Sequence, residues 1–148
     1  MYYDLDEIAS QIASELNASQ AFNHVDVVQL SNAGQLFETL DAVAALPSAV
    51  VTITSVTYGK LQRNIEVMIV VTDDFKAQPA DRAAGIWQLS TIAANLFLPQ
   101  IAKGNSPEPR LYCGIEFAVN AIRPVAGYER VAAYMITATG TEVCKYDN

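Results

Sequence analysis

Apolar residues at three- and four-residue spacing predict an amphipathic helix over residues 4–18. Its apolar stripe consists of Leu5, Ile8, Ile12 and Leu16. Asp4 begins this helix with Glu7 three residues later, a spacing that is typical of a capping box. Asp6 and Glu15 lie off the stripe, so we expect them to face solvent or a partner.

Further along the chain, stretches rich in β-branched residues and an alternating pattern predict strands. Residues 22–30 predict a short strand, and residues 49–58 and 63–72 predict two longer ones. A turn at residues 58–60 would join the longer strands into a hairpin. In the second of these, the expected faces are Ile65, Val67, Ile69 and Val71 on one side and Glu66, Met68 and Val70 on the other.

A second long helix is expected over residues 80–98, because Pro79 suits its first turn and Pro99 ends it. Trp87 lies on the apolar stripe of this helix, which predicts a core position. Residues 31–46 are ambiguous between loop and helix. A short helix that ends before Pro47 is the interpretation we favour, because the residue before a proline avoids the helical region.

Two more strands are expected over residues 112–122 and 128–143, where Gly140 would mark a bulge or a break. Neighbouring strands in this order are mostly joined as hairpins. The sequence therefore predicts a single α+β domain over residues 1–148, with a mostly antiparallel sheet of about four to five strands and two main helices packed on one face.

The formal net charge of −7 is unevenly distributed along the chain. No Lys or Arg precedes Lys60, so the whole imbalance belongs to the first 59 residues. A region without cations cannot neutralise phosphates, which argues against nucleic acid and anionic membranes as partners. Only 17% of the residues are charged, and this low fraction favours a subunit whose surface is partly covered by partner subunits.

Secretion and membrane insertion are not expected either. The N-terminal segment has no basic region followed by an apolar core, so it does not resemble a signal peptide. The longest apolar run, residues 67–71, is much too short to span a membrane. Without secretion, Cys113 and Cys144 are expected as free thiols, and a disulfide remains possible only if adjacent strands bring them together.

Catalytic and metal-binding patterns are sparse. His24 is the one histidine, and its pairing with Asp26 on a strand face provides no visible third metal ligand. The adjacent carboxylates Asp73 and Asp74 fit turn and cap residues better than an acid–base pair. The chain has no nucleophile elbow and no glycine-rich phosphate loop. We therefore expect no enzyme activity, no cofactor and no metal.

Several exposed-looking residues are instead candidates for subunit contacts. The seven tyrosines fall mostly near element ends, where amphipathic rings suit an interface. The turn at residues 58–60 and the polar loop at residues 103–110 are expected to project toward neighbours, and the three arginines could pair with acids of the first helix or remain solvated. The candidate interface residues are Asp6, Glu15, Tyr58, Lys60, Arg63, Arg123 and Arg130.

The order of elements also resembles a known family. An acidic first helix precedes the segment Leu46-Pro47-Ser48-Ala49-Val50-Val51, and the alternating strand that follows begins with Arg63. The chain closes with strands around Ile122-Arg123-Pro124-Val125 and residues 131–139. With the helix at residues 80–98, this layout resembles the Gp37/Gp68 family of Mu-like phage tail proteins. More loosely, it is similar to phage tail terminator and tail-completion proteins.

This resemblance implies a structural role without an active site. Such proteins form a ring, commonly a hexamer, that ends the tail tube and joins it to the head connector. The implied partners are therefore further copies of the chain, the tail tube and head–tail connector proteins, and the implied location is the virion tail, with the host bacterial cytoplasm during assembly. The alternative from the residues alone is a small bacterial cytoplasmic module that binds a ligand or a peptide between its sheet and helices.

Overall fold

The computed structural model describes residues 1–29, 46–74, 85–101, 104, 106–125 and 131–145. Its elements are α1 (Leu5–Ala18), β1 (His24–Val27), β2 (Ser48–Tyr58), β3 (Gln62–Asp74), α3 (Ile86–Asn95), β4 (Leu111–Tyr112), β5 (Ile115–Pro124) and β6 (Val131–Val143). Nearly all of the short helix predicted over residues 31–46 lies outside the described residues, as does Arg130.

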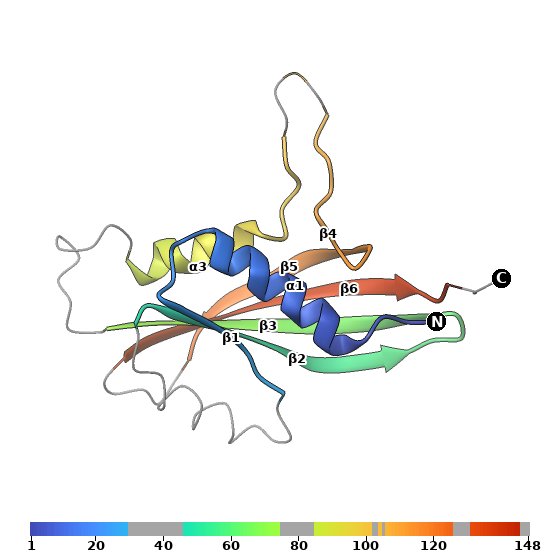
Figure 1. Cartoon of the computed structure of the whole chain (residues 1–148), viewed down its shortest axis with the longest axis horizontal. Coiled ribbons are helices and arrows are strands. Elements are labelled where there is room, and N and C mark those ends of the chain that lie inside the picture. The colour runs from blue at the N-terminus through green and yellow to red at the C-terminus, as the bar shows by residue number, and fades with distance from the viewer. Residues whose placement is uncertain (30–45, 75–84, 102–103, 105, 126–130, 146–148) are drawn as a thin grey trace.

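The strands form one curled sheet in the order β1-β2-β3-β6-β5-β4 (Figure 1). Its centre is the antiparallel pair of β3 and β6, whose register runs from Gln62 opposite Val143 to Asp74 opposite Val131. β2 and β5 flank this pair, and each is antiparallel to its inner neighbour. β1 pairs with β2 in parallel, which makes the sheet mixed.

The predicted sheet was wrong in two respects: it is mixed rather than mostly antiparallel, and it has six strands rather than four to five. β1 and β2 run in the same direction, so they are not joined as a hairpin. The additional strand is β4. A two-residue turn with positive φ at Cys113 and Gly114 separates β4 from β5 within a run that we expected to be one strand.

Both helices pack on the same face of the sheet (Figure 1). The apolar stripe of α1 is confirmed: Ile8, Ile12 and Leu16 are fully buried. The predicted capping box is wrong, since the Asp4 side chain makes no cap hydrogen bond. The core beneath the helices also contains the predicted apolar face of β3, together with Leu89, Phe117 and Ile136.

A smaller apolar cluster lies on the opposite face of the sheet. It consists of Val50, Met68, Val70 and Ala133. Nearer the β2–β3 turn, this face is lined by exposed or half-buried polar side chains that bond one another. Thr54 donates to Glu66 at 2.7 Å, and Thr141 donates to Asn64 at 2.7 Å. The second face is therefore apolar at one end and polar at the other.

Gly140 neither bulges nor breaks β6, contrary to the prediction. β6 is continuous through it, and Gly140 lies opposite Ile65 and Phe117. The irregular positions are instead between Ile53 and Ser55 in β2 and between Val119 and Ala121 in β5. A glycine is required at 140 because the sheet is crowded there: a Cβ atom would lie 2.7 Å from Cγ2 of Ile115.

Two predictions at strand and helix ends also need correction. β3 continues through Asp73 and Asp74, which lie opposite Ala132 and Val131, so these carboxylates belong to the strand and not to a turn. The described part of the second long helix is α3, which begins at Ile86. Trp87, expected in the core, is 74% exposed.

Between α3 and β4, residues 99–101, 104 and 106–110 belong to an arm that stands away from the body of the protein (Figure 1). Its two sides are held together by reciprocal backbone hydrogen bonds between Gln100 and Glu108, each 2.8 Å long. The polar loop that we expected to contact neighbours lies in this arm.

Candidate interaction surface

The end of the sheet at the β2–β3 turn contains a buried ion pair. Arg63 and Glu142 face each other across β3 and β6, and Nε of Arg63 lies 2.7 Å from Oε1 of Glu142. Their side chains are only 5% and 6% exposed. Since each charge has lost most of its hydration, the pair depends on close contact and on further hydrogen bonds.

Those further hydrogen bonds hold the N-terminal segment. The Tyr3 backbone N–H donates to Oε2 of Glu142 at 2.9 Å, and the Tyr3 carbonyl accepts from Nη2 of Arg63. The remaining Arg63 nitrogen donates to the Tyr58 hydroxyl at 3.2 Å, and the guanidinium carbon lies 4.6 Å from the centre of the Tyr2 ring. We call these five residues the clamp: Tyr2, Tyr3, Tyr58, Arg63 and Glu142.

The clamp keeps Arg63 charged. Burial alone would lower the pKa of Arg63, but hydrogen bonds with Tyr58 and Glu142 outweigh burial, and the net effect raises the pKa. The charged guanidinium can therefore serve as a permanent centre that orients the Tyr2 and Tyr58 rings at the end of the sheet.

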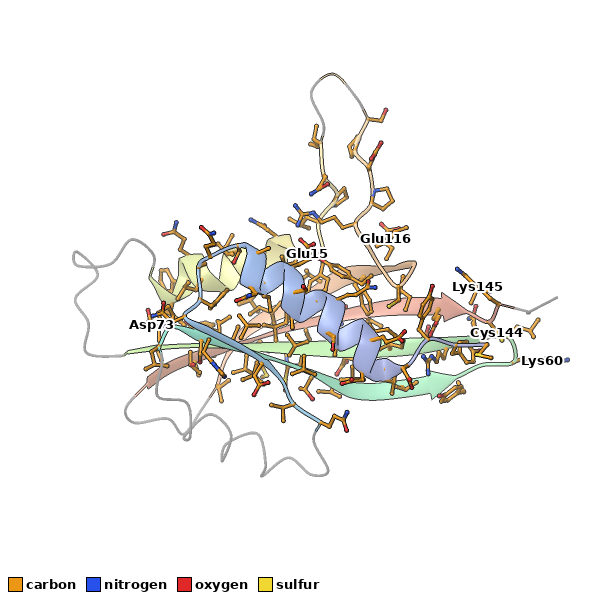
Figure 2. All side chains as sticks on the ribbon, in the orientation of Figure 1. Glu15, Lys60, Asp73, Glu116, Cys144 and Lys145 are labelled. Atoms are coloured by element: carbon orange, nitrogen blue, oxygen red, sulfur yellow. The ribbon has the colours of Figure 1, made fainter. Side chains whose placement is uncertain are left out.

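Exposed apolar side chains also lie at this end of the molecule. Half of the large apolar side chains that are exposed in the described part of the chain lie on the N-terminal segment, the β2–β3 turn and the end of β6. We call this surface the end patch; its members are Met1, Tyr3, Tyr58, Leu61 and Val143. Lys60 and Lys145 lie at the same end of the molecule (Figure 2). An apolar surface with a cationic border is typical of a protein-binding site.

The predicted interface residues are not gathered in one place. Tyr58 and Lys60 are exposed at the end patch, whereas Arg63 is buried beneath it and is paired with Glu142. Arg63 is thus neither a solvated strand residue nor free for an acid of another subunit. Asp6 and Glu15 are exposed on α1, and Arg123 is exposed on β5 near Glu66.

The sequence analysis missed Glu142, Leu61 and Val143. A signal for the ion pair was present, because Arg63 is in phase with the buried side of its strand, two residues before Ile65. Glu142 is likewise in phase with the buried Ala138. A charged residue in phase with an apolar face predicts a buried partner of opposite charge. The two exposed apolar residues carry no comparable signal.

Among the described residues, several other titratable side chains lie outside the clamp. His24 and Asp26 are exposed on β1 with 4.0 Å between Nε2 and Oδ2, which agrees with an edge pair. The described residues include no group of three or more His, Cys, Asp or Glu that could hold a metal ion. Cys113 and Cys144 are both free, and burial raises the pKa of the Cys113 thiol.

Trp87 provides a test of the exposed surface near α3. Its indole N–H donates to the Tyr134 hydroxyl at 2.9 Å, but most of the ring faces solvent. Because it is the single tryptophan, we expect a red-shifted fluorescence maximum that acrylamide quenches readily in the native state. We also expect Trp87→Phe to change the free energy of unfolding by no more than about 0.5 kcal/mol, as for other surface substitutions.

A blue-shifted, poorly quenched native spectrum would contradict this exposed position. Urea-unfolded protein provides the reference for a fully solvated indole, and Trp87→Phe shows the residual signal from tyrosine.

Comparisons with known proteins do not assign the chain to a family. No family model matches the sequence, and no curated protein matches it. Within the described residues, no helix has the length and apolar character needed to cross a membrane.

Proposed function

We propose that this chain is a structural assembly subunit of a phage or prophage tail, a tail terminator or completion protein that forms a ring and contacts the tail tube and the head connector. The observation that carries the proposal is the end patch: five exposed large apolar side chains at the end of the sheet that also contains the buried ion pair. The resemblance of its element order to Mu-like phage tail proteins supports the choice of partner class.

The geometry of the clamp supports binding by a preformed surface. The Tyr58 hydroxyl accepts a hydrogen bond from Nη1 of Arg63, and the Tyr58 side chain is still 63% exposed. Tyr2 and Tyr58 contact each other edge to face, with ring centres 5.9 Å apart. Aromatic side chains that are already fixed lose little conformational entropy on binding, so such a surface binds more tightly than mobile side chains of equal area.

Leu61 is the residue to change in order to test this surface. It is 51% exposed in the β2–β3 turn and belongs to the end patch. We expect Leu61→Asp to weaken the complex with tail-tube protein by at least about tenfold, because a central apolar contact in an interface is worth more than 1.4 kcal/mol. Native mass spectrometry and analytical ultracentrifugation of mixtures with tail-tube protein measure the loss.

Leu98→Asp is the matched control, since Leu98 is 48% exposed and lies outside the end patch. Both variants should keep the far-ultraviolet circular dichroism of the wild type. A wild-type chain that neither forms oligomers nor binds tail-tube protein overturns the proposed function. Equal effects of the two variants would show that the end patch does not bind tail-tube protein.

A further inference from the structure

An open groove lies beside the uncovered part of β2. The parallel pairing with β1 covers β2 only from Ser48 to Val51, and no described strand pairs with that edge from Thr52 to Tyr58. The groove lies between this edge and the first turn of α1 and has a volume of about 470 Å³. Its lining is mostly apolar at the base, with Leu5, Ala9, Val27, Ile53 and Val56.

The rim of the groove is acidic. Asp4 and Asp6 line it from α1, and Gln29 contributes one long hydrogen bond of 3.4 Å to Asp6. The adjoining strand edge offers backbone N–H and C=O groups that an additional strand could pair with. A groove with an apolar base, an open strand edge and an acidic rim suits an extended segment that carries apolar and basic residues.

The arm of residues 99–110 has the properties of such a segment. Ile101 is 76% exposed, which is more than any other large apolar side chain among the described residues. It follows directly after the Gln100–Glu108 pairing, so it is presented beyond the part of the arm that is held by backbone hydrogen bonds. The sequence of the arm includes Lys103 and Arg110 against one acid, Glu108, whereas the first turn of α1 has only acids.

The arm cannot fill the groove of its own chain. It joins the sheet at β4, whereas the groove lies at β2, and four strand spacings of about 5 Å each separate these two strands. The two surfaces thus lie toward opposite edges of the sheet (Figure 1). Complementary surfaces on opposite edges of one subunit produce a head-to-tail contact, which closes into a ring when the rotation between neighbours allows it.

We propose that the arm of one copy docks in the groove between α1 and β2 of a second copy, with Ile101 over the apolar base. This proposal rests on the proposed function, because it states how the ring subunits contact one another. It leaves the end patch free for the tail tube or connector, since no end-patch residue lines the groove.

Two variants, each with one introduced cysteine, test the contact directly. Ile101→Cys and Ser55→Cys are each made in a Cys144→Ser background, with the buried Cys113 retained. Ser55 lines the groove and is exposed, so its replacement preserves the core. When the two variants are mixed and oxidised, we expect a disulfide-linked dimer at about tenfold or more above the control, because docking raises the effective concentration of the two thiols.

The control mixes Ile101→Cys with Thr141→Cys, since Thr141 is an exposed position on the polar sheet face away from the groove. Crosslinking is measured by non-reducing gel electrophoresis and mass spectrometry, both for the chain alone and with tail-tube protein present. Equal crosslinking in the two mixtures, or none in either condition, overturns the docking proposal.

A charge reversal provides a second readout. We expect Asp6→Lys and Glu15→Lys together to shift the population from oligomer to monomer in native mass spectrometry, because Asp6 lines the groove and Glu15 lies beside the base of the arm. Glu116→Lys makes the same kind of charge change on an exposed residue of β5 outside both surfaces and should leave the distribution unchanged.

The outcomes separate the two proposals. An oligomer that binds tail-tube protein but gives no specific crosslink retains the proposed function and refutes the docking contact. If the specific crosslink forms while tail-tube protein is not bound, the docking contact stands and the tail role fails. Should a synthetic peptide of residues 99–110 bind the groove in chains that never assemble, the groove is a peptide-binding site and the docking proposal is wrong.

Discussion

Replacement of Glu142 by alanine is expected to lower the free energy of unfolding by about 3–5 kcal/mol. The variant leaves the Arg63 guanidinium buried without its carboxylate, which stands 2.7 Å away in the wild type. It also removes the acceptor of the Tyr3 backbone N–H. Urea denaturation followed by circular dichroism measures the loss.

Two controls distinguish the loss of the buried ion pair from the loss of a glutamate side chain in general. Glu116→Ala removes an exposed glutamate of β5 and should cost no more than about 0.5 kcal/mol. The double replacement Arg63→Met with Glu142→Leu should recover most of the loss, because apolar residues of similar volume can replace a buried pair. A cost for Glu142→Ala as small as that of Glu116→Ala would mean that the pair is hydrated.

The second large effect is expected at Gly140. Gly140→Ala should cost about 1–3 kcal/mol, since the added Cβ would lie 2.7 Å from Ile115 Cγ2 and 2.9 Å from both the Glu116 carbonyl oxygen and Phe117 Cδ1. The carbonyl oxygen belongs to the backbone of β5 and cannot move aside as a side chain could. Relief of the contact therefore requires β5 to shift relative to β6.

Gly85→Ala is the comparison for this effect, because nothing lies within 4 Å of a Cβ built at Gly85. Its expected cost is about 1 kcal/mol or less, which is the usual range for alanine at the residue before a helix. Thermal and urea unfolding of both variants would test the difference. Indistinguishable stabilities would show that β5 and β6 are less closely packed at this position.

Local periodicity was sufficient to predict the elements whose pattern is strong. The stripe of α1 and the alternation of β3 follow from residue spacing, and the structure buries the predicted sides. The same spacing was misleading for Trp87. It is in phase with the buried Ser90 and Ala94, yet it lies in the first turn of α3 and is 74% exposed.

Pairing between distant strands could not be predicted in the same way. Nothing in residues 24–27 distinguishes a parallel from an antiparallel partner, because that choice depends on the path of the crossover. The interface residues have a related limitation. Leu61 and Val143 become neighbours at the end patch only through the pairing of β3 with β6, so their common location is a property of the sheet and not of either segment.

The clamp has a consequence for the biogenesis of the protein. It joins Tyr3 to Arg63, 60 positions later, and to Glu142, 139 positions later. During synthesis, the first residues to leave the ribosome must therefore wait for β6 before they reach their final place. A nascent chain without β6 has no Glu142 and cannot hold Tyr3 in the end patch. The clamp beside the surface proposed for assembly is thus complete only after β6 has been synthesised.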